Sequence, residues 1–439
     1  MASKAQVEPT ARCDQTGIKR TDYLLEFEVP NNLMPDNQFA GKKAHLRVHR
    51  VGPTYADGDC KASKAMVLIH GRTVGGSVSF DLQHQTPGFA ALSLQEALAY
   101  AGIDTFAPDL LGYGLSTRFS LDDPANASLP GFTSEPDGLT CSNPVGCDRT
   151  RGIFPLGQQT TQLATNPLGG SLKKHTSSTH FANTNVWARD IKQVIDDAKA
   201  KTGLNKVALL GYSFGGPRVG RVWHELGNDA SAVISHLIFL STGFNALWAA
   251  NGVVENEANT EESEAEKTAT TFPLTLAQRS GWDKLKGTTD CPGREPPGAA
   301  KAFFEQAIAL DPIGAKWGGT VSNEPTGLLR APTFTNTGWN SEIAKAIKVP
   351  TLILHGQGDA TLPALNAKNL YDTLTVQRKV AVTIECAGHL MQYDTAATWE
   401  GPHQAVADAI IEWVDKKRFN GQSAGRFTID RNGVTKTEP

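Results

Sequence analysis

The chain has 439 residues, of which 40% are hydrophobic and 20% are charged, and its formal net charge is −3. This balance is typical of a globular protein and excludes disorder as the main state. The near-neutral charge offers no basic face for phosphate, so nucleic-acid binding is not expected. The longest uncharged stretch, residues 230–254, is interrupted by polar side chains and predicts a buried strand rather than a membrane span.

The N-terminal part alternates strands with a helix. Residues 23–29 and 44–49 alternate in polarity, as half-buried antiparallel strands do. Residues 65–69 and 103–107 are continuous apolar runs typical of strands buried on both faces, and residues 90–101 between them predict a helix. The order strand, helix, strand predicts a parallel sheet.

Residues 115–179 lack periodicity and are rich in Pro, Gly, Ser, Thr and Asn. We interpret them as a long loop insertion, and a loop of this length in a compact domain is typically functional or disordered. Within it, Cys141 and Cys147 bracket a turn-rich segment that predicts a small disulfide loop.

Alternation of helices and strands returns after this insertion and again near the C-terminus. The predicted elements are a helix at 185–201, strands at 206–210 and 233–240 around a helix at 217–225, strands at 351–354 and 380–384, and helices at 366–374 and 404–416. Residues 243–345 break the pattern with an acidic run, which we read as the solvated face of a helix. The polar tail from Gly421 is expected to lie over the surface.

Six cysteines bear on the compartment. Cys13 and Cys60 flank the first strands and are candidates to pair, and an even number in Gly/Pro-rich loops favours an oxidising compartment. A metal site is not expected, because paired CxxC clusters are absent. The N-terminus carries no apolar signal segment, which fits either a cytosolic protein or a mature secreted one. The cysteines therefore decide the expectation, which is a secreted or periplasmic protein with the cytoplasm as the alternative.

The sharpest motif is Gly211-Tyr-Ser213-Phe-Gly215, which follows an apolar strand and precedes a helix. A G-x-S-x-G turn at this position is strained and exposes the serine hydroxyl. The alternative is an ordinary glycine-rich turn, which the strand–turn–helix context disfavours. We therefore predict Ser213 as a nucleophile.

A serine nucleophile needs a base and an orienting acid. His389 and Asp359 follow the predicted strands at 380–384 and 351–354, so both lie at the carboxyl ends of strands, in the chain order serine, acid, histidine. We predict His389 as the base and Asp359 as the acid.

Other carboxylates are weaker candidates for the acid. Glu385 is only four residues from His389 and is poorly placed to reach the far ring nitrogen. Asp109 and Asp190 precede Ser213, and structural hydrogen bonding is expected for both.

An acyl-transfer site also needs donors for the oxyanion. The backbone N–H of Phe214 follows the nucleophile, and the N–H of Arg72 follows His70-Gly71 at the end of a strand. We predict these two groups as the oxyanion hole. The Arg72 side chain either points to solvent, forms a salt bridge or binds an anionic substrate group.

Together these residues resemble the α/β-hydrolase superfamily, in its serine-nucleophile, esterase/lipase-like branch. The matching motifs are His70-Gly71, Asp109-Leu-Leu-Gly-Tyr-Gly114, Gly211-Tyr-Ser213-Phe-Gly-Gly216, Gly358-Asp359 and Gly388-His389. The resemblance implies a mostly parallel, eight-stranded α/β sheet flanked by helices, formed by residues 1–242 and 346–439. It further implies a largely helical lid over 243–345, and the pattern departs from the family at the 115–179 insertion.

Within the superfamily, Ser213 excludes the branches that use an aspartate nucleophile, such as epoxide hydrolases and haloalkane dehalogenases. No tyrosine lies between Tyr212 and Tyr371, so the lid lacks the phenols that activate an epoxide. We expect hydrolysis of a carboxylic ester, lactone or amide through an acyl-enzyme, without cofactor or metal. C–C bond hydrolysis of a β-diketone, acyl transfer and a catalytically weak ligand-binding receptor are the alternatives.

The predicted lid is rich in aromatic side chains. They are Phe244, Trp248, Phe272, Trp282, Phe303, Phe304, Trp317, Phe334 and Trp339. We expect most of them to pack the lid onto the core, and one or two to line a pocket for a small-molecule substrate with an apolar or aromatic moiety. The oligomeric state stays open between a monomer and a loose association.

Overall fold

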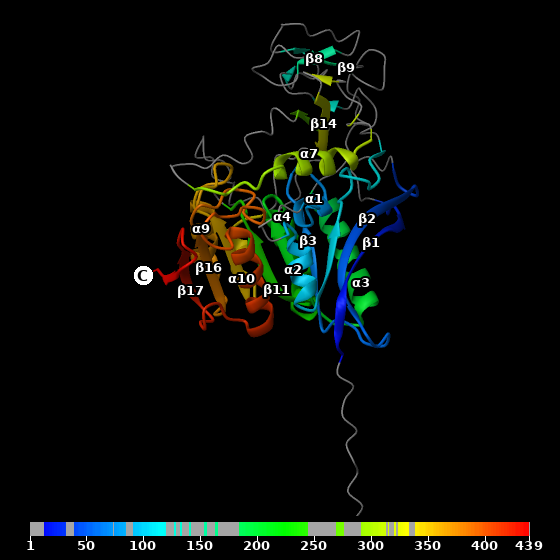
Figure 1. Ribbon diagram of the computed structural model, residues 1–439. Coiled ribbons are helices and arrows are strands. Elements are labelled where there is room, and N and C mark those ends of the chain that lie inside the picture. Colours follow the sequence, from blue (N-terminus) through cyan, green and yellow to red (C-terminus); the bar gives the residue numbers. More distant parts are fainter. Residues whose placement is uncertain are drawn as a thin grey trace, which may run out of the picture.

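The computed structural model describes most of the core in full and several inserted strands by their backbone (Figure 1). The described residues are 13–31, 39–72, 74–84, 91–119, 184–244, 291–312, 315 and 339–438, together with the short strands named below. None of the described helices is long and apolar enough to cross a membrane.

One ten-stranded, mostly parallel sheet forms the centre of the molecule. Its order is β1 (Gln15–Glu28), β2 (Lys43–Tyr55), β4 (Ile103–Pro108), β3 (Lys64–Ile69), β10 (Val207–Tyr212), β11 (Ile234–Leu240), β15 (Thr351–Gly356), β16 (Lys379–Ile384), β17 (Gly425–Ile429) and β18 (Thr435–Thr437). The strands from β4 to β17 run parallel, whereas β1, β2 and β18 pair antiparallel with their neighbours. This architecture confirms the predicted α/β class.

Helices cover both faces of the sheet and divide its core into two layers. One face packs against α3 (Thr184–Thr202), α4 (Gly215–Leu226), α8 (Ser341–Lys345) and α9 (Leu365–Thr373). The other face packs against α1 (Gly76–Phe80), α2 (Leu94–Tyr100), α7 (Ala299–Ala309) and α10 (Pro402–Lys416). Alternate residues of the central strands belong to opposite layers, as Val67 and Leu68 of β3 do. Continuous apolar runs therefore mark these strands, because both of their faces are buried.

The C-terminal segment differs from the prediction. We expected the tail from Gly421 to lie over the surface, but β17 and β18 extend the predicted eight strands by two. Phe427 is fully buried and Ile429 is 5% exposed. The short alternation of these apolar residues with Arg426 and Thr428 is a half-buried strand pattern hidden in an otherwise polar stretch.

The described residues of the predicted lid form both helices and strands. Besides α7 and α8, its described residues form β12 (Ala269–Thr275), β13 (Thr320–Val321) and β14 (Glu324–Pro332). The division of the chain into a core and a lid stays a prediction.

The two inserted segments share one small sheet. Strand β5 (Ala127–Ser128), from the 115–179 insertion, pairs in parallel with β12 of the predicted lid. The insertion also contains two short hairpins, β6 (Phe132–Thr133) with β7 (Thr140–Cys141), and β8 (Ile153–Pro155) with β9 (Leu163–Thr165). Figure 1 shows β8, β9 and β14 together beyond the end of the core that carries α1 and α7.

Two disulfides occur among the described residues. Cys13 bonds Cys60, which confirms that pairing, and Cys291 bonds Cys386. The predicted Cys141–Cys147 bond lies outside the described residues, because Cys147 is not among them.

Candidate functional site

Ser213 stands between β10, which ends at Tyr212, and α4, which begins at Gly215. Its backbone φ is +54°, in the left-handed region that non-glycine residues rarely adopt. A Cβ atom on Gly215 would lie 2.2 Å from the carbonyl oxygen of Ile69 in the neighbouring strand β3. Only glycine lets the helix approach the sheet this closely, and the turn holds the Ser213 side chain at the carboxyl end of the strand.

The structure brings the three predicted triad residues together. The Nε2 atom of His389 lies 2.9 Å from Oγ of Ser213, and its Nδ1 atom lies 2.8 Å from Oδ2 of Asp359. The other carboxylate oxygen of Asp359 accepts hydrogen bonds from the N–H groups of Thr361 and Leu362, each at 2.8 Å. The ionised carboxylate is an acceptor only, so it fixes the ring proton on Nδ1 and leaves the Nε2 lone pair for the Ser213 hydroxyl.

Burial and charge act in opposite directions on Asp359. Its side chain is fully buried, and burial alone opposes ionisation, but the charge of His389 and the hydrogen bond to it lower the pKa of Asp359 below its ordinary value. His355, at the end of β15, is also buried, and burial lowers its pKa, so this ring is neutral. The ring of Tyr212 packs 5.2 Å from the ring of His389. Asp359 therefore stays charged although its side chain is buried.

A buried histidine organises the loop beside Ser213. The N–H of Leu110 donates to Nε2 of His70 at 3.1 Å, so Nδ1 carries the proton and donates to the carbonyl oxygen of Gly71 at 2.7 Å. Burial, together with the positive charge of Arg218, lowers the pKa of His70 to about 3. A Cβ atom on Gly71 would lie 2.8 Å from Cβ of Ser213. This loop therefore abuts the serine and contains a histidine that stays neutral near pH 7.

Two hydrogen bonds fix the carbonyl oxygen of the peptide that links Ser213 to Phe214. That oxygen accepts hydrogen bonds from the N–H of Gly216 at 3.1 Å and from the hydroxyl of Thr242 at 3.2 Å. The C=O and N–H groups of a trans peptide point in opposite directions. The N–H of Phe214 is therefore directed away from these two donors.

The same reasoning applies to the peptide between Gly71 and Arg72. Its carbonyl oxygen accepts from Nδ1 of His70 and lies 3.5 Å from Nη1 of Arg218. The N–H of Arg72 must then point the opposite way. Each predicted oxyanion donor thus belongs to a peptide whose orientation is set by hydrogen bonds to its carbonyl oxygen.

The other carboxylates weighed from the sequence take different partners. Each accepts a hydrogen bond from a backbone N–H group: Glu385 from Arg431 at 3.0 Å, Asp109 from Gly76 at 2.7 Å and Asp190 from Leu111 at 3.1 Å. Burial raises the pKa of Asp190 to about 6. The hydrogen bonds of Glu385, Asp109 and Asp190 are therefore structural. The Asp359 carboxylate, in contrast, faces the His389 ring.

Few of the lid aromatics are described, and those that are lie inside the core layers. Phe244 packs 5.1 Å from the ring of Trp339, which stacks on Phe239 at 5.7 Å. Phe303 and Phe304 of α7 are 3% and 2% exposed. The remaining aromatic side chains of the predicted lid lie outside the described residues. The four described ones pack their segments onto the sheet.

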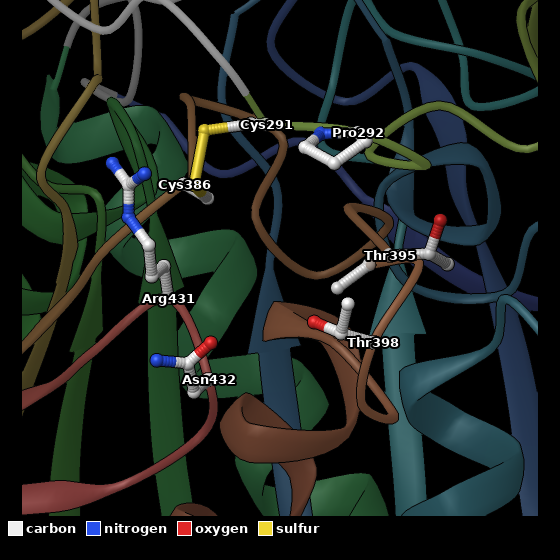
Figure 2. A pocket seen from close by; sticks show the side chains of 8 residues that line it. Cys291, Pro292, Cys386, Thr395, Thr398, Arg431 and Asn432 are labelled. Atoms are coloured by element: carbon white, nitrogen blue, oxygen red, sulfur yellow. A yellow bond between two sulfur atoms is a disulfide. The ribbon is translucent and has the colours of Figure 1, made fainter.

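The Cys291–Cys386 disulfide forms part of the lining of a small pocket (Figure 2). Its volume is about 160 Å³, and it is lined by Cys291, Pro292, Cys386, Thr395, Ala396, Thr398, Arg431 and Asn432. Ser213, His389 and Asp359 do not line it. Among the described residues, no cluster of His, Cys, Asp or Glu has an arrangement that would hold a metal ion.

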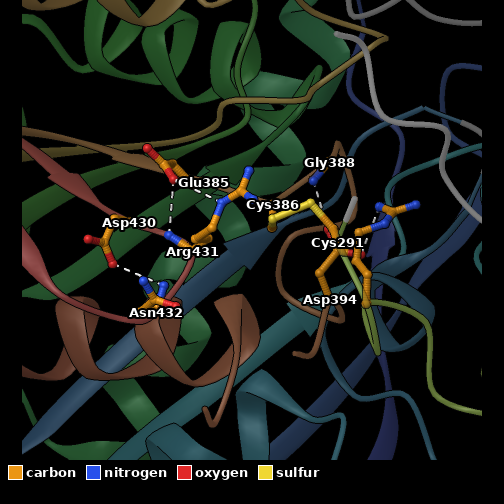
Figure 3. The surroundings of a disulfide bond; sticks show 9 residues. Cys291, Glu385, Cys386, Gly388, Asp394, Asp430, Arg431 and Asn432 are labelled. Atoms are coloured by element: carbon orange, nitrogen blue, oxygen red, sulfur yellow. Dashed lines mark hydrogen bonds and ion pairs between the residues drawn. A yellow bond between two sulfur atoms is a disulfide. The ribbon is translucent and has the colours of Figure 1, made fainter. Parts of the chain in front are cut away.

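The loop that carries His389 is held by residues that the sequence did not single out. Cys386, three positions before His389, is bonded to Cys291, and the N–H of Gly388 donates to Asp394 at 2.7 Å (Figure 3). The position of Cys386 in the histidine loop is a signal that sequence reasoning could have used. Asp394 offers no such signal, because it belongs to no motif.

Comparison with known proteins gives matches in solved structures, while no curated protein matches significantly. A bromoperoxidase from Bacillus anthracis is 14% identical, with 90% of this chain and 100% of that chain covered at a TM-score of 0.45. An esterase from Thermogutta terrifontis is 14% identical, with 90% and 98% covered at a TM-score of 0.45. A meta-cleavage product hydrolase from Pseudomonas fluorescens is 12% identical, with 85% and 96% covered at a TM-score of 0.40.

The family comparison is more decisive. The model of the alpha/beta hydrolase family matches residues 66–409, a span that begins in β3 and ends in α10. This span contains the Ser213 turn, the Asp359 loop and the His389 loop. The chain belongs to the alpha/beta hydrolase family.

Proposed function

We propose that this protein is a serine hydrolase that cleaves a carboxylic ester, or a lactone or amide, through an acyl-enzyme on Ser213. The observation that carries the proposal is the continuous chain of hydrogen bonds from Ser213 through His389 to Asp359, at 2.9 and 2.8 Å. A serine hydroxyl is a weak nucleophile until a neighbouring base takes its proton. Here the base is within hydrogen-bond distance and is itself oriented by a carboxylate.

In the proposed reaction, Oγ of Ser213 attacks the carbonyl carbon while its proton passes to Nε2 of His389. The N–H groups of Phe214 and Arg72 receive the oxyanion that forms. His389 then gives the proton to the leaving oxygen or nitrogen, which departs and leaves the acyl group on Ser213. A water molecule, deprotonated by His389, releases the acid and restores the serine.

The electrostatics support these roles. The lowered pKa of Asp359 keeps its carboxylate ionised near neutral pH, so it balances the imidazolium that forms on His389. The ring of His70 remains neutral down to about pH 3, so the loop that presents the Arg72 N–H keeps one hydrogen-bond pattern throughout the working range. No cofactor enters this proposal.

Replacing the nucleophile tests the proposal directly. Ser213→Ala is expected to lower turnover of an activated aryl ester by about 10³-fold or more and to abolish labelling by a fluorophosphonate. Ser241→Ala is a matched control, because Ser241 is also buried at the end of a neighbouring strand but belongs to no proposed step. Full turnover or full labelling in Ser213→Ala would remove the nucleophile assignment.

A substrate panel separates ester hydrolysis from other reactions on the same residues. Aryl esters, lactones, amides and a β-diketone are compared, each with and without an alcohol as acyl acceptor. Preference for the diketone would indicate C–C bond hydrolysis, and transfer to the alcohol would indicate an acyltransferase. Labelling of Ser213 without turnover, together with tight ligand retention, would indicate a receptor.

The expected substrate is a small molecule with an apolar or aromatic moiety. The aromatic residues of the predicted lid support this class, because aromatic side chains favour such groups in pockets. The disulfides Cys13–Cys60 and Cys291–Cys386 support a secreted or periplasmic place of action, since such bonds persist in oxidising compartments.

A further inference from the structure

The carboxylate of Asp394 accepts a hydrogen bond from the Ala387–Gly388 peptide, which lies one peptide before the Gly388–His389 bond. Asp394 is fully buried, and its Oδ2 atom accepts the N–H of Gly388 at 2.7 Å (Figure 3). On the other side of this peptide, the carbonyl oxygen of Ala387 accepts the N–H of Gly358 at 2.9 Å. The Ala387–Gly388 peptide is therefore held between Asp394 and the loop that carries Asp359.

Gly356 adds a steric limit to the same place. A Cβ atom on Gly356 would lie 2.4 Å from the carbonyl oxygen of Gly388 and 2.6 Å from that of Ala387. The histidine loop thus rests against the end of β15 with no space between the two backbones. Any rotation of the Ala387–Gly388 peptide would break a hydrogen bond or create a clash.

Asp394 is itself fixed from several directions. Its Oδ1 atom accepts from Nη1 of Arg294 at 3.0 Å, and the Arg294 side chain is only 11% exposed. Its carbonyl oxygen accepts the N–H of His403, at the start of α10, at 2.8 Å. A buried carboxylate requires a paired charge and full hydrogen bonding, and Asp394 has both.

Arg294 belongs to a short segment of the predicted lid, which begins at Cys291 and precedes α7. Residues 291–294 lie against residues 394–397, with the N–H of Thr395 donating to the carbonyl of Arg294 at 2.8 Å and the N–H of Ala397 donating to that of Pro292 at 3.0 Å. Cys291 of the same segment is bonded to Cys386. Residues 291–294 are therefore connected to the histidine loop in two ways. Cys291 is bonded covalently to Cys386, and Arg294 pairs with Asp394, which accepts the N–H of Gly388.

We propose that Asp394 is a positioning residue for His389: together with Arg294 it fixes the Ala387–Gly388 peptide and so sets the distance from Nε2 to Oγ of Ser213. This inference rests on the proposed function. It is a statement about orientation, because Asp394 contacts neither the reacting atoms nor the His389 ring nitrogens in the bonds described. Misplacing a catalytic group by about 1 Å costs up to ~10²-fold in rate.

The test removes the acceptor and then restores it. Asp394→Ala leaves the N–H of Gly388 without its acceptor and is expected to lower kcat for an aryl ester by about tenfold, with KM within about twofold. Rates are expressed per active site titrated with a fluorophosphonate, so unfolded protein does not contribute. Asp394→Asn retains an oxygen for Gly388 and is expected to recover most of kcat.

Asp104→Ala is the matched control. Asp104 is also buried and paired with an arginine, Arg50, but it lies at the start of β4, at the end of the sheet opposite the site. Its loss is expected to lower stability with kcat per site unchanged. If Asp394→Ala behaves in the same way, or if Asp394→Asn recovers nothing, the inference is wrong.

A second variant decides the matter if Asp394→Ala does not fold. Arg294→Gln keeps the acceptor at Gly388 but loosens the carboxylate, and a several-fold fall in kcat is expected, partly recovered in Arg294→Lys. Unchanged kcat in Arg294→Gln would overturn the inference. Failure of the proposed function is distinguishable, because the wild-type protein would then show no turnover that depends on Ser213.

Discussion

The turn at Ser213 and the loop at His389 face each other across one hydrogen bond, yet they are built in different ways. Around Ser213, backbone packs on backbone, and glycines such as Gly215 make that contact possible. Around His389, a disulfide and the buried Asp394 connect the loop to a segment about a hundred residues earlier in the chain. The first arrangement depends on close backbone packing, whereas the second adds a disulfide and side-chain hydrogen bonds to the backbone packing of Gly356 against the loop.

This difference predicts how each half of the site fails. Steric packing tolerates no added atom, so a single methyl group is enough to displace the serine. Side-chain bonds can be removed one at a time, so the histidine loop is expected to lose activity in steps. Three measurements follow, in order of their expected effect on activity, and the last of them concerns stability alone.

Gly215→Ala attacks the serine turn. The new Cβ would lie 2.2 Å from the carbonyl oxygen of Ile69 and 2.9 Å from that of His70, both backbone atoms that have no rotamer to change. We expect turnover to be lost and the free energy of unfolding to fall by about 3 kcal/mol. Urea denaturation and aryl ester hydrolysis measure the two effects.

Gly58→Ala provides the comparison for that variant, because a Cβ there has nothing within 4 Å. It is expected to leave turnover and unfolding within experimental scatter of the wild type. A Gly215→Ala protein with wild-type turnover would show that the turn is not sterically restricted.

Removing a disulfide tests the histidine loop. The double variant Cys291→Ser/Cys386→Ser is expected to lose about 2–4 kcal/mol of stability and several-fold in kcat, because the bond constrains both the unfolded chain and the loop. The control, Cys13→Ser/Cys60→Ser, breaks a bond in the N-terminal strands and is expected to lose stability alone. The sequence separation is 95 residues for Cys291–Cys386 and 47 residues for Cys13–Cys60. Removing the first bond should therefore cost about 0.6 kcal/mol more stability than removing the second.

Thermal or denaturant unfolding gives the stability of both double variants, and turnover per titrated site gives kcat. Equal kcat values for the two proteins would mean that the disulfide next to His389 has no influence on its position.

The smallest expected effect concerns the neutral His70. Its pKa in the folded protein is about 3, below the ordinary value of 6.5, so the unfolded chain binds a proton in this interval and the folded protein does not. The contribution of the neutral His70 ring to the free energy of unfolding is complete above pH 6.5. It is lost as the pH falls towards 3, by about 1.4 kcal/mol per pH unit. His70→Asn lacks this titration, so the stability difference between wild type and variant should shrink from pH 6 to pH 4.

Other buried histidines, such as His236 and His403, occur in both proteins, and their contributions cancel in that difference. Denaturant unfolding at several pH values is the measurement. A stability difference that stays constant with pH would contradict the neutral, buried His70.

The residues that belong to sequence motifs could be placed from the sequence, whereas the residues that hold the histidine loop could not. The order of Ser213, Asp359 and His389 on strand ends followed from apolar runs and glycine turns, which are encoded within a few residues. Asp394 was not predicted, because its partner Arg294 comes from a segment 100 residues earlier in the chain. The pairing of β5 with β12 escaped prediction for the same reason, since two inserted segments form it together.

The C-terminal tail shows a different limit of prediction from sequence. Strand β17 has only two buried apolar positions, Phe427 and Ile429. They alternate with polar residues over only five positions, which is too short for a clear strand pattern. Its stability comes from pairing with β16 and from packing in the core, neither of which a local pattern records. The Cys13–Cys60 bond, in contrast, was predictable from where the first strands begin and end.

The position of β17 also has a consequence for the way the chain matures. Strand β16 leads into the His389 loop, and the ribosome makes it before it makes the strand that covers its open side. Until β17 pairs, β16 presents a row of unpaired N–H and C=O groups, which is the surface on which strands of separate chains associate. The β17–β18 hairpin therefore covers a side of β16 that would otherwise be an open sheet edge next to the site.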